Sequence, residues 1–133
     1  MYLKSLSLKK KIALVTGAGK GIGRASAIAL AEAGADLIIL SRTEKDLIRV
    51  KKEINELKRK CDFHVCDLFN FDQITEVFSK INRLDILVNN AGTNIPEFFN
   101  KIKKEDMDYM VDLNLKASFH VAQLASRKML KSK

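Results

Sequence analysis

The chain has 133 residues, of which 47% are hydrophobic and 30% charged, as is usual for one folded domain. No apolar stretch is long enough to cross a bilayer and lysines interrupt the N-terminus, so we expect a cytoplasmic protein with neither signal peptide nor membrane contact. The net charge of +8 lies in residues 1–60, which hold 14 Lys and Arg against 6 Asp and Glu. That half lacks a nucleic-acid-binding motif and any interleaving of basic with aromatic residues, so it favours a small anionic ligand over nucleic acid.

Apolar, β-rich runs alternate along the chain with amphipathic helical patterns. The predicted strands are residues 11–16, 36–41, 62–66 and 84–88, and the predicted helices are residues 22–33, 44–59, 71–81 and 104–131. Thr43 and Asn70 stand at typical N-cap positions before two of the helices. Such alternation over residues 1–133 predicts an α/β, doubly wound parallel sheet with right-handed crossovers. If the rule for dinucleotide-binding folds applies, its strand order is 3-2-1-4 and a ligand binds at the carboxyl ends of the strands.

The segment Thr16–Gly23 (TGAGKGIG) joins the first predicted strand to the first predicted helix. Gly17 allows a tight turn, while Gly21 and Gly23 allow the backbone to approach a pyrophosphate and the helix to pack on the strand. The N–H groups at the start of the helix then face the phosphates, whose charge the helix dipole favours. The spacing G-x-x-x-G-x-G is not that of the usual fingerprint, and a plain turn is the alternative, but its position between a strand and a helix favours nucleotide binding.

Thr16–Gly23 resembles the TGxxxGIG loop of the short-chain dehydrogenase/reductase family, and Asn89–Gly92 (NNAG) matches that family's motif after its fourth strand. The resemblance runs from about Leu8 to the end of the chain and implies a Rossmann fold, a nicotinamide dinucleotide, and hydride transfer to or from a carbonyl or alcohol carbon. Asn89 is then expected to tie neighbouring strand ends together. The residues that the two motifs offer to the cofactor are Gly17, Lys20, Gly21, Ile22, Gly23, Asn90, Ala91 and Gly92.

The end of the second predicted strand bears on the choice between NAD and NADP. An acidic residue there would accept the 2′-hydroxyl of NAD, but this chain has Ser41 and Arg42, and a guanidinium suits the 2′-phosphate of NADP. Lys20 is expected to reach the same phosphate, and the pair resembles the family's NADP-preferring pattern. The alternative is that Lys20 and Arg42 are solvated surface charges. We expect NADP, with Ser41 and Thr43 either adding hydroxyl donors or only capping the next helix.

The resemblance assigns three further residues. It implies that Asp67 accepts the adenine amino group and that Leu68 lines the adenine pocket, with a plain turn aspartate as the alternative. Asn114 falls where the family has a helix asparagine that positions a water in a proton relay, and it is our one catalytic candidate; a polar residue on an exposed turn is the alternative. Two cysteines and two distant histidines make no metal set, so we expect no metal and interpret Cys61 and Cys66 as reduced and structural.

The family's catalytic serine strand and Tyr-x-x-x-Lys motif do not occur in these 133 residues. The sequence therefore resembles the N-terminal, cofactor-binding half of an NADP(H)-dependent oxidoreductase, and we expect the chain alone to be inactive. A small carbonyl or alcohol would be the substrate if the missing half completed the site. A non-catalytic dinucleotide-binding or assembly module, or one part of a split enzyme, is the alternative.

The end of the chain suggests self-association. Residues 84–88 would form an apolar edge strand, which invites pairing with another chain. The long helix is also apolar on one side, and the matching helix of the family resembles a dimer-forming element. We expect a homo-oligomer, the alternative being a helix that folds back over the edge strand. The apolar residues on that side of the helix are Met107, Met110, Val111, Leu115, Phe119, Ala122 and Leu124.

Overall fold

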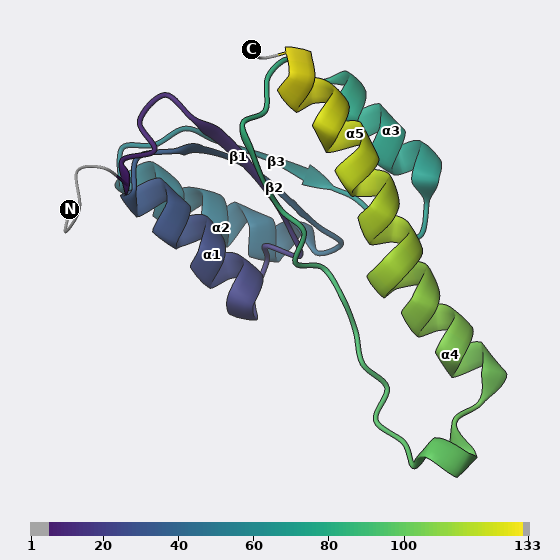
Figure 1. Ribbon diagram of the computed structural model, residues 1–133. Coiled ribbons are helices and arrows are strands. Elements are labelled where there is room, and N and C mark those ends of the chain that lie inside the picture. The colour runs from purple at the N-terminus through teal and green to yellow at the C-terminus, as the bar shows by residue number, and fades with distance from the viewer. Residues whose placement is uncertain (1–5, 132–133) are drawn as a thin grey trace.

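A four-stranded parallel sheet forms the centre of the computed structural model, which describes residues 6–131 (Figure 1). Its order is β3-β2-β1-β4, as predicted, and Leu14 of β1 lies opposite Ile38 of β2 on one side and Leu87 of β4 on the other. This is the Rossmann-like arrangement in which the strand order reverses beside the first strand. The strands are β1 (Ile12–Thr16), β2 (Asp36–Ser41), β3 (Cys61–Val65) and β4 (Ile86–Val88).

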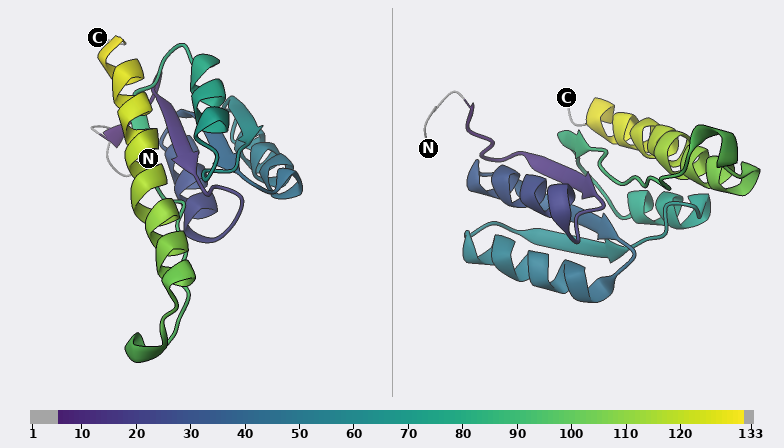
Figure 2. Two further views of the ribbon diagram at one scale, coloured as in Figure 1. Left: turned by 90° about the vertical axis from the view of Figure 1, so that its right-hand side faces the viewer. Right: turned by 90° about the horizontal axis from the view of Figure 1, so that it is seen from below.

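Helices cover both faces of the sheet (Figures 1 and 2). The helices α1 (Gly21–Glu32) and α2 (Glu44–Glu56) cover one face, and α3 (Phe71–Ser79) and α5 (Ser118–Lys131) cover the other. Because side chains alternate across a strand, Val15 packs into the core under α1 and α2, whereas its neighbour Leu14 packs into the core under α3 and α5. No helix within residues 6–131 has the length and apolar character that a membrane span requires.

The last helical run differs from the single α-helix predicted over residues 104–131. It begins as α4 (Lys104–Val111), continues as the π-helical segment η3 (Asp112–Ala117), and ends as α5. A π-helix keeps the run helical but shifts the backbone hydrogen bonds by one residue, a change that the apolar pattern of a sequence does not reveal. Figure 1 shows α4 projecting beyond the sheet, joined to β4 by a long loop that contains the short helix η2 (Phe99–Lys101).

Only one side of this run packs on the sheet. Leu113, Ala117, Val121 and Ala125 are buried in the core, and their spacing of four residues marks the packed side. The apolar residues that were predicted on one side of the helix therefore fall into two groups, one in contact with the rest of the protein and one exposed. Leu124 packs against the core, and the Met110 Sδ accepts the Ile95 N–H at 3.4 Å. The exposed large members of the set are Met107, Val111, Leu115 and Phe119.

Several elements end earlier or begin later than predicted. α2 ends at Glu56 rather than at residue 59, because Lys58 adopts a left-handed conformation with a φ of 62°. The Lys58 and Arg59 N–H groups donate back to the Asn55 and Ile54 carbonyls, which closes the helix in a Schellman motif. α3 ends two residues before the predicted end at residue 81, and β4 begins two residues after the predicted start at residue 84. The other differences are of one residue, which is the usual uncertainty of element boundaries: β1 begins one residue later than predicted, and α1 and β3 each lie one residue earlier along the chain.

The two predicted N-caps have different outcomes. The Asn70 Oδ1 accepts hydrogen bonds of 3.1 Å from the N–H groups of Asp72 and Gln73, which confirms Asn70 as the cap of α3. Thr43 does occupy the N-cap position of α2, as predicted, but its side chain makes no capping bond to the helix. The Thr43 backbone instead binds the Ser41 hydroxyl, which accepts from its N–H at 3.2 Å and donates to its carbonyl at 3.3 Å.

Candidate functional site

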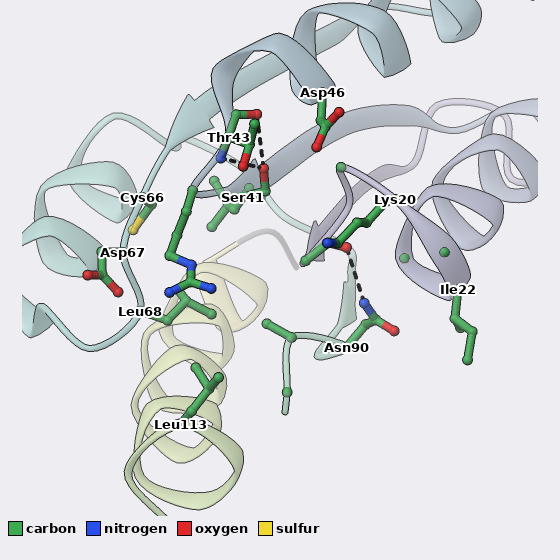
Figure 3. Close-up of a pocket in the computed structure, with 18 of the residues that line it drawn as sticks. Lys20, Ile22, Ser41, Thr43, Asp46, Cys66, Asp67, Leu68, Asn90 and Leu113 are labelled. Carbon is green, nitrogen blue, oxygen red and sulfur yellow. Dashed lines mark hydrogen bonds between the residues drawn. The ribbon is translucent and has the colours of Figure 1, made fainter. Parts of the chain in front are cut away.

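A cavity of about 530 Å³ opens at the carboxyl ends of the strands, beside the point between β1 and β4 where the strand order reverses (Figure 3). Crevices at this position are where open α/β sheets bind their ligands. Every residue that the sequence assigned to the cofactor contributes to its lining. These residues are Gly17, Lys20, Gly21, Ile22, Gly23, Ser41, Arg42, Asp67, Leu68, Asn90, Ala91 and Gly92.

The glycine loop closes one end of the cavity, and two of its glycines are required by geometry. Gly17 has a φ of 63°, and a Cβ at Gly23 would lie 2.2 Å from the Gly17 carbonyl oxygen, so only a glycine fits there. Gly21 also has a positive φ, of 56°, and the position of its missing Cβ has no neighbour within 4 Å. Lys20 makes no side-chain cap at the start of α1. The first N–H groups of the helix are therefore suited to an anionic ligand.

A reciprocal pair of contacts joins the ends of β1 and β4 beneath the cavity. The buried Thr16 Oγ1 accepts the backbone N–H groups of Asn90 and Ala91, each at 3.0 Å. The Asn90 Nδ2 donates in return to the carbonyl oxygens of Thr16 at 3.1 Å and of Gly17 at 3.4 Å. Asn90 thus holds the glycine loop against the NNAG segment, and its direct contact with a cofactor stays a prediction.

The tie between strand ends was expected of Asn89, and that expectation is wrong. The Asn89 Nδ2 donates to the Ser118 carbonyl at 2.7 Å and so joins the end of β4 to the first residue of α5. The strand-to-strand tie belongs instead to the neighbouring Asn90. Side chains alternate in direction along an extended segment, so the two asparagines reach different partners.

The basic end of the cavity lies where β2 leads into α2. Lys20 and Arg42 are both exposed there, and neither has an ion-pair partner among residues 6–131. Asp46, in the first turn of α2, lines the same end and was not identified from the sequence. Its carboxylate lies 3.3 Å from the Arg49 guanidinium, which also donates to the Gly19 carbonyl at 3.2 Å. No motif marks Asp46 or Arg49, because an acid and a base three residues apart are common on helix surfaces.

The residues after β3 form the wall of the cavity next to the end of β2, where the Cys66 N–H donates to the Ser41 carbonyl at 2.9 Å. The Asp67 Oδ1 accepts the Phe69 N–H at 3.1 Å, which is the turn contact that the sequence allowed as an alternative. Asp67 also lines the cavity, and its contact with an adenine stays a prediction. Leu68 is buried and Phe69 adds an aromatic ring to the lining.

Both cysteines are free thiols within buried positions, Cys66 in the cavity wall and Cys61 in the core. Burial raises the pKa of Cys61 to about 12 and the pKa of Cys66 to about 11. Each thiol is therefore protonated at neutral pH and has little thiolate with which to react or bind metal.

Asn114, the catalytic candidate, does not line the cavity. It lies in η3, where its Oδ1 accepts the Thr93 N–H at 2.8 Å and its Nδ2 donates to the Thr93 carbonyl at 2.7 Å. A Cβ at Gly92 would come within 3.1 Å of the same Oδ1. The structure thus shows Asn114 fixing the segment that follows the NNAG motif, and its part in a proton relay stays a prediction.

The sheet order, the glycine loop with its open helix start, and the cavity at the reversal of strand order together define a Rossmann-type nucleotide-binding domain. Residues 11–133 match the family model described as short chain dehydrogenase. The chain therefore belongs to the short-chain dehydrogenase/reductase family.

Individual relatives agree with this assignment. The chain is 36% identical to the 3-oxoacyl-(acyl-carrier-protein) reductase of Thermotoga maritima, over 96% of this chain and 54% of that protein. It is 37% identical to the L-xylulose reductase of Mesocricetus auratus, over 94% of this chain and 50% of that protein. Its fold matches a crystal structure of carveol dehydrogenase from Mycobacterium avium in complex with NAD, with a TM-score of 0.84 and 26% identity over 93% of this chain and 51% of that one. The chain spans about half the length of these relatives.

Proposed function

We propose that this chain is the NADP(H)-binding half of a short-chain oxidoreductase that moves hydride between the nicotinamide and a carbonyl or alcohol carbon. The observation that carries the choice of NADP(H) is the pair of exposed cations, Lys20 and Arg42, at one end of the cavity. The end of β2 offers Ser41 and Arg42 where a carboxylate would favour NAD. A guanidinium and an ammonium together suit a phosphate that carries up to two negative charges.

The residues present fit a dinucleotide. The open start of α1 suits the pyrophosphate, and no protein atom lies within 4 Å of the missing Cβ position at Gly21, so the backbone of the loop is open there. Lys20 and Arg42 would hold the 2′-phosphate, Asp67 and Leu68 the adenine, and Asn90 to Gly92 the ribose next to the nicotinamide. When bound, the cofactor supplies the carbon that gives or takes the hydride.

The substrate class is proposed from the family. The names of the Thermotoga and Mesocricetus relatives both denote reductases, one of a 3-oxoacyl thioester and the other of a sugar. Both reactions reduce a carbonyl group, and we propose that class of substrate for the complete site. Asn114 contributes by fixing Thr93, while the groups that donate a proton in the family, Tyr and Lys of a Tyr-x-x-x-Lys motif, do not occur in these 133 residues.

We also propose that copies of the chain associate through the exposed side of the helical run. Met107, Val111, Leu115 and Phe119 follow one another at intervals of four residues, and each side chain is at least 39% exposed. Contiguous apolar surface of this kind is rarely left open in a monomer. The packed side of the run does fold over the sheet beside β4, so association by the helix is proposed in preference to pairing of strand edges.

The proposal for the cofactor is tested by isothermal titration calorimetry of the purified chain with NADPH and with NADH at one ionic strength. We expect NADPH to bind more tightly, because only its 2′-phosphate uses both cations. Equal or tighter binding of NADH would reject the choice of NADP(H). Binding of neither nucleotide would reject the cofactor-binding role itself and leave the non-catalytic assembly module as the better description.

A further inference from the structure

The proposed phosphate end of the cavity contains a carboxylate as well as two cations. Asp46 lines the cavity together with Ser41, Arg42 and Thr43, and its side chain is 28% exposed. Figure 3 shows Asp46 at the edge of this group, next to the glycine loop that carries Lys20. An unpaired carboxylate at this position would repel a 2′-phosphate and offset part of the attraction of Lys20 and Arg42.

Arg49 neutralises that carboxylate from outside the cavity. Its Nη2 lies 3.3 Å from the Asp46 Oδ1, one helical turn back on α2, and it is not itself a lining residue. The same Nη2 donates to the Gly19 carbonyl oxygen at 3.2 Å. Gly19 in turn packs closely on this corner, since a Cβ there would lie 3.0 Å from the Asp46 Cβ and 3.1 Å from the Ser41 Oγ. Arg49 thus forms an ion pair with Asp46 and, through the same nitrogen, a hydrogen bond with a carbonyl of the glycine loop.

We propose that Arg49 is a specificity-determining residue of the cofactor site. By forming an ion pair with the Asp46 carboxylate, it favours the binding of a 2′-phosphate. Without Arg49, the carboxylate would repel a phosphate but would still accept a hydrogen bond from a ribose 2′-hydroxyl. Loss of Arg49 is therefore expected to lower the preference for NADP(H) over NAD(H), and removal of the Asp46 charge is expected to restore it. The inference rests on the proposed function, because it assumes that the 2′-phosphate binds at this corner.

Two fragments of the cofactor test the proposal on the part of the site that this chain contains. Adenosine 2′,5′-bisphosphate carries the 2′-phosphate, and adenosine 5′-monophosphate carries a hydroxyl in its place. We expect R49Q to weaken binding of the bisphosphate by about threefold to tenfold, the range for a partly exposed ion pair beside a charged ligand, and to leave the monophosphate within about twofold. The double variant R49Q/D46N is expected to recover the bisphosphate affinity of the unmodified chain.

The matched control is K52Q, which removes one positive charge from an exposed position on the same helix outside the cavity. It should change neither affinity beyond the small effect of net charge, and thermal unfolding of each variant shows that it is folded. An equal loss for both fragments in R49Q would overturn the inference and would mean that Arg49 only positions the loop through Gly19. A loss that persists in R49Q/D46N would also overturn it, because the effect would not pass through Asp46.

The proposed function is tested separately, by the affinities of the unmodified chain for the two fragments. Tighter binding of the monophosphate than of the bisphosphate would reject the NADP(H) assignment, whatever R49Q does to the ratio. Binding of neither fragment would reject the cofactor site and the inference together. Tighter binding of the bisphosphate combined with an unchanged ratio in R49Q would leave the proposed function intact and reject the role of Arg49 alone.

Discussion

Thr16 and Asn90 bind each other twice, through the Thr16 Oγ1 and the Asn90 N–H at 3.0 Å and through the Asn90 Nδ2 and the Thr16 carbonyl at 3.1 Å. They are 74 residues apart in the chain, and the pair brings the glycine loop and the NNAG segment to the same edge of the sheet. The geometry of the cavity therefore depends on a buried hydroxyl at the end of β1.

Replacing that hydroxyl with a methyl group tests the dependence. Thr16→Val keeps the shape of the side chain but leaves the Ala91 N–H without its acceptor and the Asn90 N–H with the Val88 carbonyl alone, so we expect a loss of about 1–3 kcal/mol in the free energy of unfolding. Urea denaturation measures the change. Thr16→Ser retains the hydroxyl and serves as the control, and similar stabilities for the two variants would contradict the proposed contact.

Arg42 is expected to contribute directly to the binding of NADPH. Arg42→Asp removes a charge-assisted contact with the 2′-phosphate and should weaken NADPH by about 1–3 kcal/mol. Calorimetry with NADPH and NADH separates this loss from a general effect, because NADH lacks the phosphate. Lys52→Asp, the same reversal of charge away from the cavity, is the control. An unchanged NADPH affinity in Arg42→Asp would show that Arg42 is a solvated surface charge.

The polypeptide of 133 residues is expected to show no carbonyl reduction. General acid–base assistance is typically worth about 10²–10⁴-fold, and the groups that supply it in the family do not occur in these residues. NADPH oxidation is followed by absorbance with a panel of 3-oxoacyl thioesters and sugars, beside a full-length family member as the positive control. Oxidation that co-purifies with the chain and scales with its concentration would contradict the expectation.

Asp85 is expected to make stability fall in acid. Burial of its side chain, which is 10% exposed, would raise the pKa, but the Ile12 N–H together with Arg83 and Lys11 lowers it below the ordinary value of 3.8. Because the folded-state pKa is the lower one, the stabilisation is present above about pH 4 and is lost as the pH falls through the folded-state value.

The variant Asp85→Asn isolates this contribution. We expect it to lower stability by about 1–3 kcal/mol at pH 7, and we expect the difference to shrink as the pH is lowered toward 2 and the carboxylate of the unmodified chain becomes protonated. Chemical denaturation across this pH range gives the comparison. Glu76→Gln is the control, since its ion pair with Lys80, four residues further along the chain, joins two exposed side chains and contributes little to stability. A difference between Asp85→Asn and the unmodified chain that stays constant down to pH 2 would contradict the linkage.

Self-association is expected to depend on Leu115 and Phe119, which are 63% and 68% exposed. Leu115→Glu and Phe119→Glu place charges on the proposed contact and should shift a dimer or larger species toward monomer, as measured by light scattering after gel filtration. Ile48→Glu changes an exposed apolar residue on α2 and should not alter the assembly. A monodisperse monomer of 15.0 kDa at high concentration of the unmodified chain would contradict the proposal.

The features of the structure that could be predicted from the sequence are those marked by a hydrophobic periodicity or by a motif. The alternation of apolar runs and amphipathic helices predicted the parallel sheet, the rule for dinucleotide-binding folds predicted its strand order, and two glycine-containing motifs identified two of the segments that line the cavity. The contacts that complete the site are different in kind. Arg49 binding the Gly19 carbonyl and Thr16 binding Asn90 depend on the three-dimensional approach of distant segments, which no local pattern encodes. The different partners of Asn89 and Asn90 show the same limit, because two adjacent identical residues differ only in which way the backbone turns them.

The π-helical segment η3 divides the last helical run into two parts of unequal anchorage. α4 buries no side chain, whereas η3 and α5 together bury four. Amide hydrogen exchange should therefore rise sharply on passing from α5 into α4, since local opening of α4 exposes little apolar surface. Asn114 holds Thr93 at the boundary between the two parts. Leu113 in η3 lines the cavity, so the boundary between the two parts of the run lies at the cavity wall, and α4 can fluctuate on a faster timescale than the wall that it adjoins.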